Sequence, residues 1–316
     1  MQPKNQNYLF ISILVLLLSF KFIESMAHYY FNEDDLWSLS QTLSMPKGNW
    51  GWSRLAHEPD GQVYKNYSYV ILFYIPFKIF GVSHFTYTSA YFLYIILSVL
   101  GIYKIFKEYS FLKFFLSLTL VSSVYTYNFR FEILAIFLII LGLFFYFKGN
   151  KNSYIALFLF AWAALIHPGT FVALFFVMVH LIYYENKIFE IKTILIYLSV
   201  FIFFCLLLIG FNINNLIDTI VVRPELQVRF LVLRPEKIIK SLAITGVFVW
   251  SFVLLLKKTS WISILIIVFN IFIYFLFKKS YYYPYLILHI IILFYYNRDK
   301  IIEIFKNCNF CRPSRF

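Results

Sequence analysis

Residues 8–27 read YLFISILVLLLSFKFIESMA, and this apolar stretch decides the class of fold. It follows a short polar segment, residues 1–7. Its length matches the roughly 20 mostly apolar residues that a helix needs to cross the hydrocarbon core of a bilayer. The stretch is too long for the core of a signal peptide, and no convincing small-residue cleavage site follows it. We therefore expect a retained membrane-spanning helix.

The composition of the whole chain agrees with membrane insertion. Of its 316 residues, 61% are hydrophobic and 14% are charged, whereas soluble chains carry about 25% charged residues. The expected fold is therefore an all-α polytopic membrane protein with about ten spans, and residues 1–316 form a single transmembrane domain. The predicted spans are residues 8–27, 85–106, 113–129, 131–147, 153–167, 169–184, 193–211, 238–256, 260–277 and 282–297.

The longest polar segment, residues 28–84, lies between the first two predicted spans. It predicts two juxtamembrane helices. One opens at Asn32 and carries acidic residues in its first turn, where carboxylates interact favourably with the helix dipole. The other runs from about Tyr64 to Phe80, and we expect it to lie along the membrane surface because it is apolar but short. A second long loop, residues 212–237, is expected on the same side of the membrane.

Short linkers between the predicted spans are basic and fall on one face of the membrane. Short basic loops mark the cytoplasmic side, so both termini are expected in the cytoplasm. This interfacial role accounts for the net charge of +13. Nucleic-acid binding is not expected, because a basic patch for nucleic acid needs a soluble face. The basic linker residues are Lys4, Lys104, Lys107, Lys113, Lys148, Lys151, Lys187, Lys192, Lys257, Lys258, Arg298 and Lys300.

The cysteines indicate neither a disulfide framework nor a metal centre. The chain has three of them, Cys205, Cys308 and Cys311. Cys308 and Cys311 form a single C-x-x-C pair, which is half of a zinc site.

Ionisable residues gather at the opposite, extracytoplasmic ends of the predicted spans. Charge at membrane depth is costly and usually lines a cavity or a pathway. Arg130 and Glu132 could instead be a neutralising pair that only stabilises helix packing, and His167, before Pro-Gly, could only mark a helix end. The candidates at this face are Glu33, Asp34, Asp35, His57, Glu58, Arg130, Glu132, His167, Arg223, Arg229, Arg234, Lys278 and Lys279.

These residues combine an acidic centre with a ring of cations. A carboxylate such as Asp34 or Asp35 can deprotonate an acceptor hydroxyl, and Arg or Lys can neutralise a phosphate leaving group. The apolar remainder of the protein would accommodate a lipid tail. The sequence requires no cofactor, although a divalent metal could bridge the Asp34 and Asp35 carboxylates and the phosphate.

Two motifs and the span that follows them carry a family resemblance. They are FNEDDLWSL at residues 31–39 and HEPDGQVYKNYSYVILFYIPFKIFG at residues 57–81, before a span that opens near SHFTYTSAYFLYIILSVLGIYKIF, residues 83–106. Their order resembles that of the GT-C superfamily of membrane glycosyltransferases. Within it, the motifs are most similar to those of the protein O-mannosyltransferase and aminoarabinose transferase branch. The resemblance covers residues 8–170, and only the general plan of the chain matches beyond them.

The resemblance implies roles for individual residues. One of Asp34 and Asp35 would be the catalytic carboxylate of the acidic motif that follows the first span. His57-Glu58-Pro59 corresponds to an HPP-like turn, with Glu58 where the commoner motif has proline, and Arg130-Phe131-Glu132 corresponds to an R-P-E-like turn. Glu33 and His167 are predicted to bind substrate because they lie at the same face, without a counterpart in the resemblance. Basic residues of the late outer loops would contact the lipid phosphate, namely Arg223, Arg229, Arg234, Lys278 or Lys279.

The function that we expect is inverting transfer of a hexosyl or pentosyl group from a polyprenyl-phosphate donor to a cell-envelope glycan, lipid or protein. The enzyme would lie in a bacterial cytoplasmic membrane and act on its outer side. A lipid-linked glycan flippase or other transporter, a polysaccharide polymerase or ligase, and a purely structural membrane subunit are the alternatives. Transport sites usually lie near the bilayer midplane between repeats, whereas here the polar residues concentrate at one face.

Overall fold

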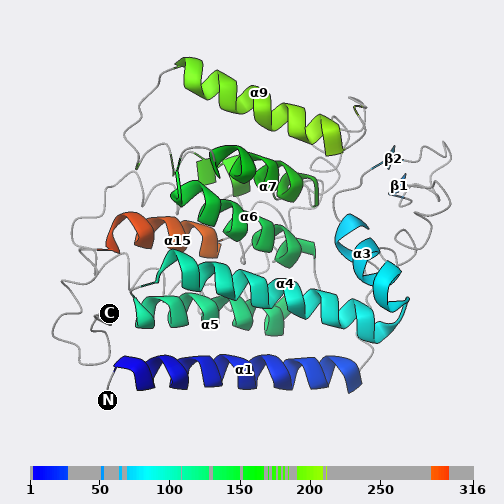
Figure 1. The fold of residues 1–316 in the computed structure, drawn as a ribbon, viewed down its shortest axis with the longest axis vertical. Helices are drawn as coiled ribbons and strands as arrows, with labels where there is room; N and C mark the ends of the chain where they lie inside the picture. Colours follow the sequence, from blue (N-terminus) through cyan, green and yellow to red (C-terminus); the bar gives the residue numbers. More distant parts are fainter. Residues whose placement is uncertain are drawn as a thin grey trace, which may run out of the picture.

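The computed structural model describes residues 3–27, 51–52, 64–65, 70–107, 109–127, 131–149, 152–166, 191–208 and 286–298, together with residues 170, 173–175, 177–178, 181, 184 and 211. Over these residues the fold is almost entirely helical, which confirms the all-α part of the expectation (Figure 1). The helices are α1 (Pro3–Ala27), α3 (Val70–Phe80), α4 (His84–Ile105), α5 (Ser110–Tyr127), α6 (Phe131–Phe147), α7 (Asn152–Ile166), α9 (Ile191–Leu208) and α15 (Leu286–Tyr296).

Two of the described helices are long and apolar enough to cross a membrane. They are the Asn7–Ala27 part of α1, and α4. The apolar parts of α5, α6, α7, α9 and α15 are shorter. The ten-span topology therefore stays a prediction, and the predicted spans at residues 238–256 and 260–277 lie outside the described residues.

A short strand pairing departs from the expected helices. β1 (Gly51–Trp52) pairs antiparallel with β2 (Tyr64–Lys65), and Trp52 stands opposite Tyr64. The prediction of a helix from about Tyr64 is therefore wrong at its start, because α3 begins only at Val70. Residues 63–69 read VYKNYSY. Aromatic and β-branched residues favour strands, while Asn and Ser hydrogen-bond to nearby backbone and compete with helix formation.

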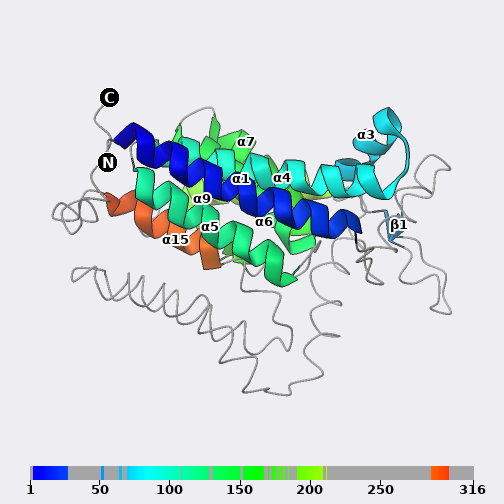
Figure 2. The same ribbon diagram turned by 90° about the horizontal axis from the view of Figure 1, so that it is seen from below.

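The helices α4, α5, α6 and α7 run in alternating directions and form one row (Figure 1). α1 packs against α4 and α5 at one side of this row (Figure 2), and α9 packs against α7 at the other (Figure 1). α6 lies between α4 and α7, and α15 contacts α5 and α6. The chain therefore passes repeatedly between the same two ends of the bundle.

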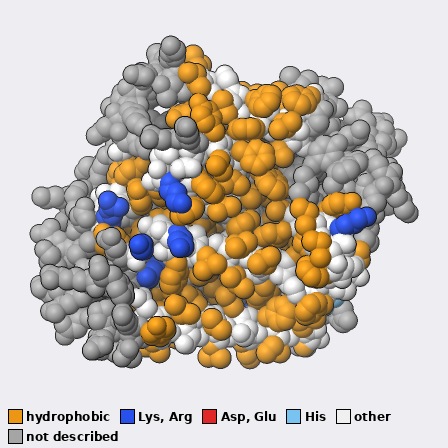
Figure 3. Space-filling model, in the orientation of Figure 1, with side chains coloured by type: hydrophobic (Ala, Val, Ile, Leu, Met, Phe, Trp, Pro, Cys, Tyr) orange, Lys and Arg blue, Asp and Glu red, His pale blue; other side chains and the backbone are white. Residues whose placement is uncertain are grey.

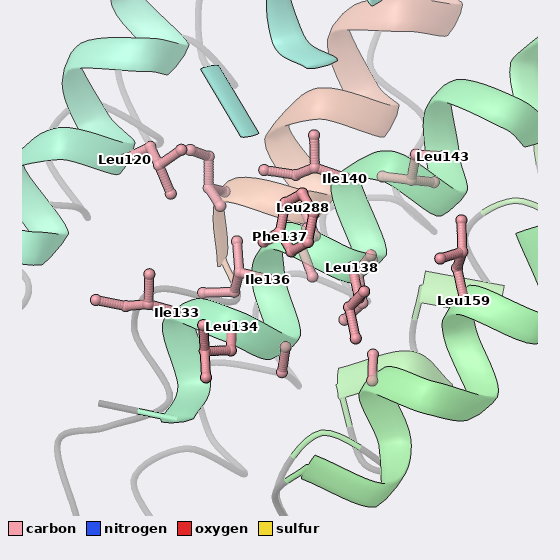
Figure 4. Close-up of a cluster of buried hydrophobic side chains, with 14 of the residues drawn as sticks. Leu120, Ile133, Leu134, Ile136, Phe137, Leu138, Ile140, Leu143, Leu159 and Leu288 are labelled. Atoms are coloured by element: carbon pink, nitrogen blue, oxygen red, sulfur yellow. The ribbon is translucent and has the colours of Figure 1, made fainter. Parts of the chain in front are cut away.

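The core is centred on α6. Every side chain from Ile133 to Ile140 is buried, on all sides of the helix. Figure 4 shows these side chains with Leu120 of α5, Leu159 of α7 and Leu288 of α15 around them. A helix that is hydrophobic all round is expected to be buried, and here the surrounding helices supply that environment.

Candidate functional site

Contacts between helices define the two ends of the bundle. At the first, which we call the His84 end, His84 of α4 reaches Ser25 near the end of α1, and Leu165 of α7 clusters with Leu208 of α9. At the second, the Lys148 end, Tyr295 of α15 stacks on Phe147 at the end of α6, with ring centroids 3.7 Å apart. Helices α1, α5, α7 and α9 thus finish at the His84 end, and α4 and α6 begin there, whereas the shorter α15 begins midway along the bundle and ends at the Lys148 end (Figure 1).

Several helix ends that adjoin predicted site residues in the sequence lie at the His84 end, whereas α15, the described helix that follows Lys278 and Lys279, starts midway along the bundle (Figure 1). α1 finishes at Ala27, before the acidic segment, and α7 finishes at Ile166, directly before His167. Glu132 is the second residue of α6, and the structure describes its backbone only. The other candidates lie outside the described residues: Glu33, Asp34, Asp35, His57, Glu58, Arg130, His167, Arg223, Arg229, Arg234, Lys278 and Lys279.

A hydrogen bond joins α1 to α4 at this end. The Nε2 atom of His84 lies 2.9 Å from the carbonyl oxygen of Ser25, although the two residues are 59 positions apart in the sequence. Because a carbonyl only accepts hydrogen bonds, Nε2 carries the proton and donates it. The last carbonyls of a helix have no partner within that helix, so His84 satisfies one of them in α1. The rings of Phe22 and Phe85 also meet edge to face beside this bond.

The first turn of α4 is capped by its own sequence. Ser83 has extended backbone angles, φ −153° and ψ 159°, and its Oγ accepts a hydrogen bond from the backbone N–H of Thr86 at 3.0 Å. Serine is among the preferred residues for this N-cap position. The cap and the His84 bond together fix the two points at which residues 28–83 leave α1 and join α4. This segment carries five of the predicted site residues.

An ion pair inside α1 is a feature that the sequence analysis missed. The Nζ atom of Lys21 lies 2.9 Å from Oε2 of Glu24. Lys21 is buried and lies one helical turn before Ser25. Ionisable residues within a membrane span are costly and are often functional, but a pair one turn apart also neutralises itself. The signal was visible as a Lys and a Glu three positions apart within an otherwise apolar run.

The Lys148 end differs in chemistry, because it combines cations with stacked aromatic rings. Lys148 lies over the ring of Phe144, with its Nζ atom 4.4 Å from the centroid, and Arg298 lies over Tyr295 at 5.4 Å. Figure 3 shows Lys and Arg side chains gathered towards this end on an otherwise hydrophobic face. Aromatic residues and cations of this kind are enriched where a protein meets the membrane surface.

Metal binding at the His84 end stays a prediction. Among the residues that the structure describes, no group of three or more His, Cys, Asp or Glu side chains could hold a metal ion. Asp34 and Asp35, the proposed ligands, lie outside them.

The family resemblance rests on the sequence motifs at residues 31–39 and 57–81. The chain matches no protein-family model, no curated protein and no solved structure.

Proposed function

We propose that this protein is a membrane glycosyltransferase. It would move a sugar from a polyprenyl-phosphate carrier to a cell-envelope glycan, lipid or protein. The observation that carries the proposal is the shared location of helix ends that adjoin candidate residues, since the ends of α1, α5, α7 and α9 and the start of α6 all lie at the His84 end (Figure 1). Segments that are far apart in the sequence can therefore contribute to one site.

The surface of the bundle supports membrane insertion. Large apolar side chains are exposed along α1, including Leu16, which is 71% exposed, Phe20 and Ile23. Hydrophobic side chains also dominate the face in Figure 3. Soluble proteins rarely expose contiguous apolar patches of this extent. Short basic linkers favour the cytoplasmic side, so in this proposal the Lys148 end would face the cytoplasm and the His84 end would face the outside of a bacterial cytoplasmic membrane.

The proposed reaction is a single displacement at the anomeric carbon. Asp34 or Asp35 accepts the proton of the acceptor hydroxyl, whose oxygen forms the new glycosidic bond. The bond from the anomeric carbon to the phosphate oxygen breaks, and polyprenyl phosphate leaves with that electron pair. Arg223, Arg229, Arg234, Lys278 and Lys279 are the candidate cations that stabilise the departing phosphate.

The described contacts would help to position this carboxylate. The Ser25–His84 bond and the Ser83 cap fix both ends of residues 28–83, so the acidic segment starts from a defined point next to α4. Accurate positioning of reacting groups supplies a large part of enzymatic rate enhancement. Two neighbouring carboxylates are also a suitable donor set for Mg²⁺, which would offset phosphate charge, but the displacement itself does not require a metal ion.

The test is release of polyprenyl phosphate by the purified protein from a polyprenyl-phosphate sugar with an acceptor present. We expect Asp34→Asn or Asp35→Asn to lower the rate by about 100-fold or more, because general-base catalysis contributes on that order. Asp299→Asn is the matched control and should leave the rate unchanged, since Asp299 directly follows Arg298 in the sequence and Arg298 lies at the Lys148 end.

Two outcomes would contradict the proposal. Full activity in both the Asp34 and the Asp35 variants would remove these carboxylates from the mechanism. Movement of a labelled donor across a vesicle membrane without release of polyprenyl phosphate would instead indicate a lipid-linked glycan transporter.

A further inference from the structure

The tight turn between α4 and α5 lies at the Lys148 end of the bundle, on the opposite side from the proposed active site (Figure 1). Backbone hydrogen bonds of 3.0 Å from the N–H of Phe106 to the carbonyl of Ile102, and from the N–H of Tyr109 to the carbonyl of Phe106, define it. Phe106 is buried beneath the turn. The side chains that this turn presents are therefore held on a fixed backbone.

Lys113, in the first turn of α5, is a buried cation. The residue is 8% exposed, and its Nζ atom donates a hydrogen bond of 3.3 Å to the carbonyl oxygen of Lys107. The same ammonium lies 5.2 Å from the centroid of the Tyr103 ring. Across the described part of the chain, no carboxylate forms an ion pair with it. An ammonium has three donors, and burying it without a counter-ion is costly.

A second polar group, the hydroxyl of Tyr103, belongs to the ring beside Lys113. The hydroxyl of Tyr103 is buried and finds no hydrogen-bond partner among the residues described in the structure. A buried hydroxyl without a hydrogen bond costs free energy. Lys113 and Tyr103 together offer several N–H and O–H donors that no described residue uses. An anionic oxygen ligand such as a phosphate is bound by donors of this kind.

The surroundings of this pair are also positive. Lys104 and Lys107 are exposed on the same turn, and the first turn of α5 contains no acidic residue. The backbone N–H groups at the start of α5 add to the positive potential, because the N-terminus of a helix attracts anions. In the sequence, three lysines and Glu108 give residues 104–113 a formal charge of 3 − 1 = +2.

An apolar stripe leads along α4 towards these lysines. Leu93, Leu97 and Leu100 are exposed at helical spacing, and Lys104 follows Leu100 by four positions. Residues four apart lie on the same face of a helix. An acyl chain can therefore lie along this stripe while its headgroup reaches the lysines, which a free phosphate ion cannot do.

We propose that the α4–α5 turn binds the phosphate headgroup of an anionic phospholipid. Lys104, Lys107 and Lys113 supply the positive charge, the hydroxyl of Tyr103 supplies a hydrogen bond, and the stripe on α4 holds an acyl chain. Basic pockets between helices on the cytoplasmic side are a known mode of anionic-lipid recognition in general. The proposal rests on membrane insertion of α4 and does not depend on sugar transfer.

The test is native mass spectrometry of the full chain purified in detergent, with phosphatidylglycerol or phosphatidylcholine of the same acyl chains added. We expect selective retention of phosphatidylglycerol. Lys107→Gln and Lys113→Gln should each weaken that retention about fivefold, as expected for one lysine near an anionic headgroup. Lys78→Gln is the matched control, because Lys78 is exposed on α3 away from this turn, and it should leave retention unchanged.

Each other outcome has a defined meaning. Lys107 is exposed, so its variant keeps the test valid even if Lys113→Gln fails to fold, as far-ultraviolet circular dichroism would show. Equal retention of the two lipids, or equal losses in Lys107→Gln and Lys78→Gln, would overturn the site. Displacement of phosphatidylglycerol by inorganic phosphate would overturn the assignment to a lipid. A chain that stays soluble without detergent would overturn the membrane insertion itself.

Discussion

Helices α1 and α6 are both strongly apolar, yet they occupy opposite environments. In α6 every side chain from Ile133 to Ile140 is buried by neighbouring helices (Figure 4). α1 packs against α4 and α5 on one side and exposes large side chains such as Leu16 and Ile23 on the other. Apolar composition alone therefore does not separate a core helix from a peripheral one. The two helices differ in their position in the bundle. Neighbouring helices surround α6 with apolar side chains, whereas the outer face of α1 needs an apolar environment from outside the protein.

Truncation of one side chain in each helix should give the largest difference. Ile140→Ala should lower the free energy of unfolding by about 3 kcal/mol, because Ile140 is fully buried and its loss leaves a cavity. Leu16→Ala should change it by less than about 0.5 kcal/mol, since that side chain has few protein contacts to lose. Reversible unfolding in detergent micelles measures both values. Equal losses would mean that α1 is packed within the protein as tightly as α6.

The contact between α6 and α7 offers a sharper test of close packing. A Cβ atom added at Gly142 would lie 2.5 Å from Cε1 of Phe160, whose ring is buried. Gly142→Ala should therefore cost about 2 kcal/mol through overpacking. Phe160→Leu should recover part of that loss in the double variant, because the smaller side chain gives the new methyl room. Strictly additive losses in the double variant would show that the two residues are not in contact.

The smallest expected effect is at the junction of α1 with α4. His84→Ala removes the hydrogen bond to the carbonyl of Ser25 and should cost about 1 kcal/mol, as is usual for a single hydrogen bond. Leu93→Ala, on the exposed face of the same helix, is the control and should cost less. The same unfolding assay applies. A stability equal to that of the wild type in His84→Ala would show that this bond does not hold the two helices together.

Much of the helical framework could be predicted from the sequence. The predicted range 131–147 coincides with α6, and the ranges 85–106 and 153–167 lie within one residue of α4 and α7. These helices are apolar runs bounded by clear signals, such as the Ser83 cap of α4 and the basic residue Lys148 after α6. Their alternating directions followed from the short linkers, as expected for antiparallel neighbours.

The features that depend on tertiary contact could not be predicted in the same way. α1 begins at Pro3 instead of Tyr8, because a helix can continue beyond its apolar part and proline suits its first turn. The β1–β2 pairing depends on residues 12 or more positions apart, which local patterns do not reveal. Lys113 has the sequence signature of a linker cation, yet the α4–α5 turn buries it.

From the sequence, the candidate site could be predicted only as a set of residues at the extracytoplasmic ends of the predicted spans. The structure places the ends of α1, α5, α7 and α9 and the start of α6 at the His84 end, while the roles of Asp34, Asp35 and the basic residues remain proposals. The Lys21–Glu24 pair was missed because both residues lie within an apolar run that already accounted for a span.

The central claim is that the two ends of the bundle face opposite sides of a membrane, with the His84 end outside. Single cysteines at Val82, beside the start of α4, and at Lys107, in the α4–α5 turn, test it directly, because both positions are exposed. The background would carry serine at Cys205, Cys308 and Cys311. In right-side-out vesicles, a membrane-impermeant maleimide should label Val82→Cys at once and Lys107→Cys only after permeabilisation. Labelling of both positions from the same side would contradict the account.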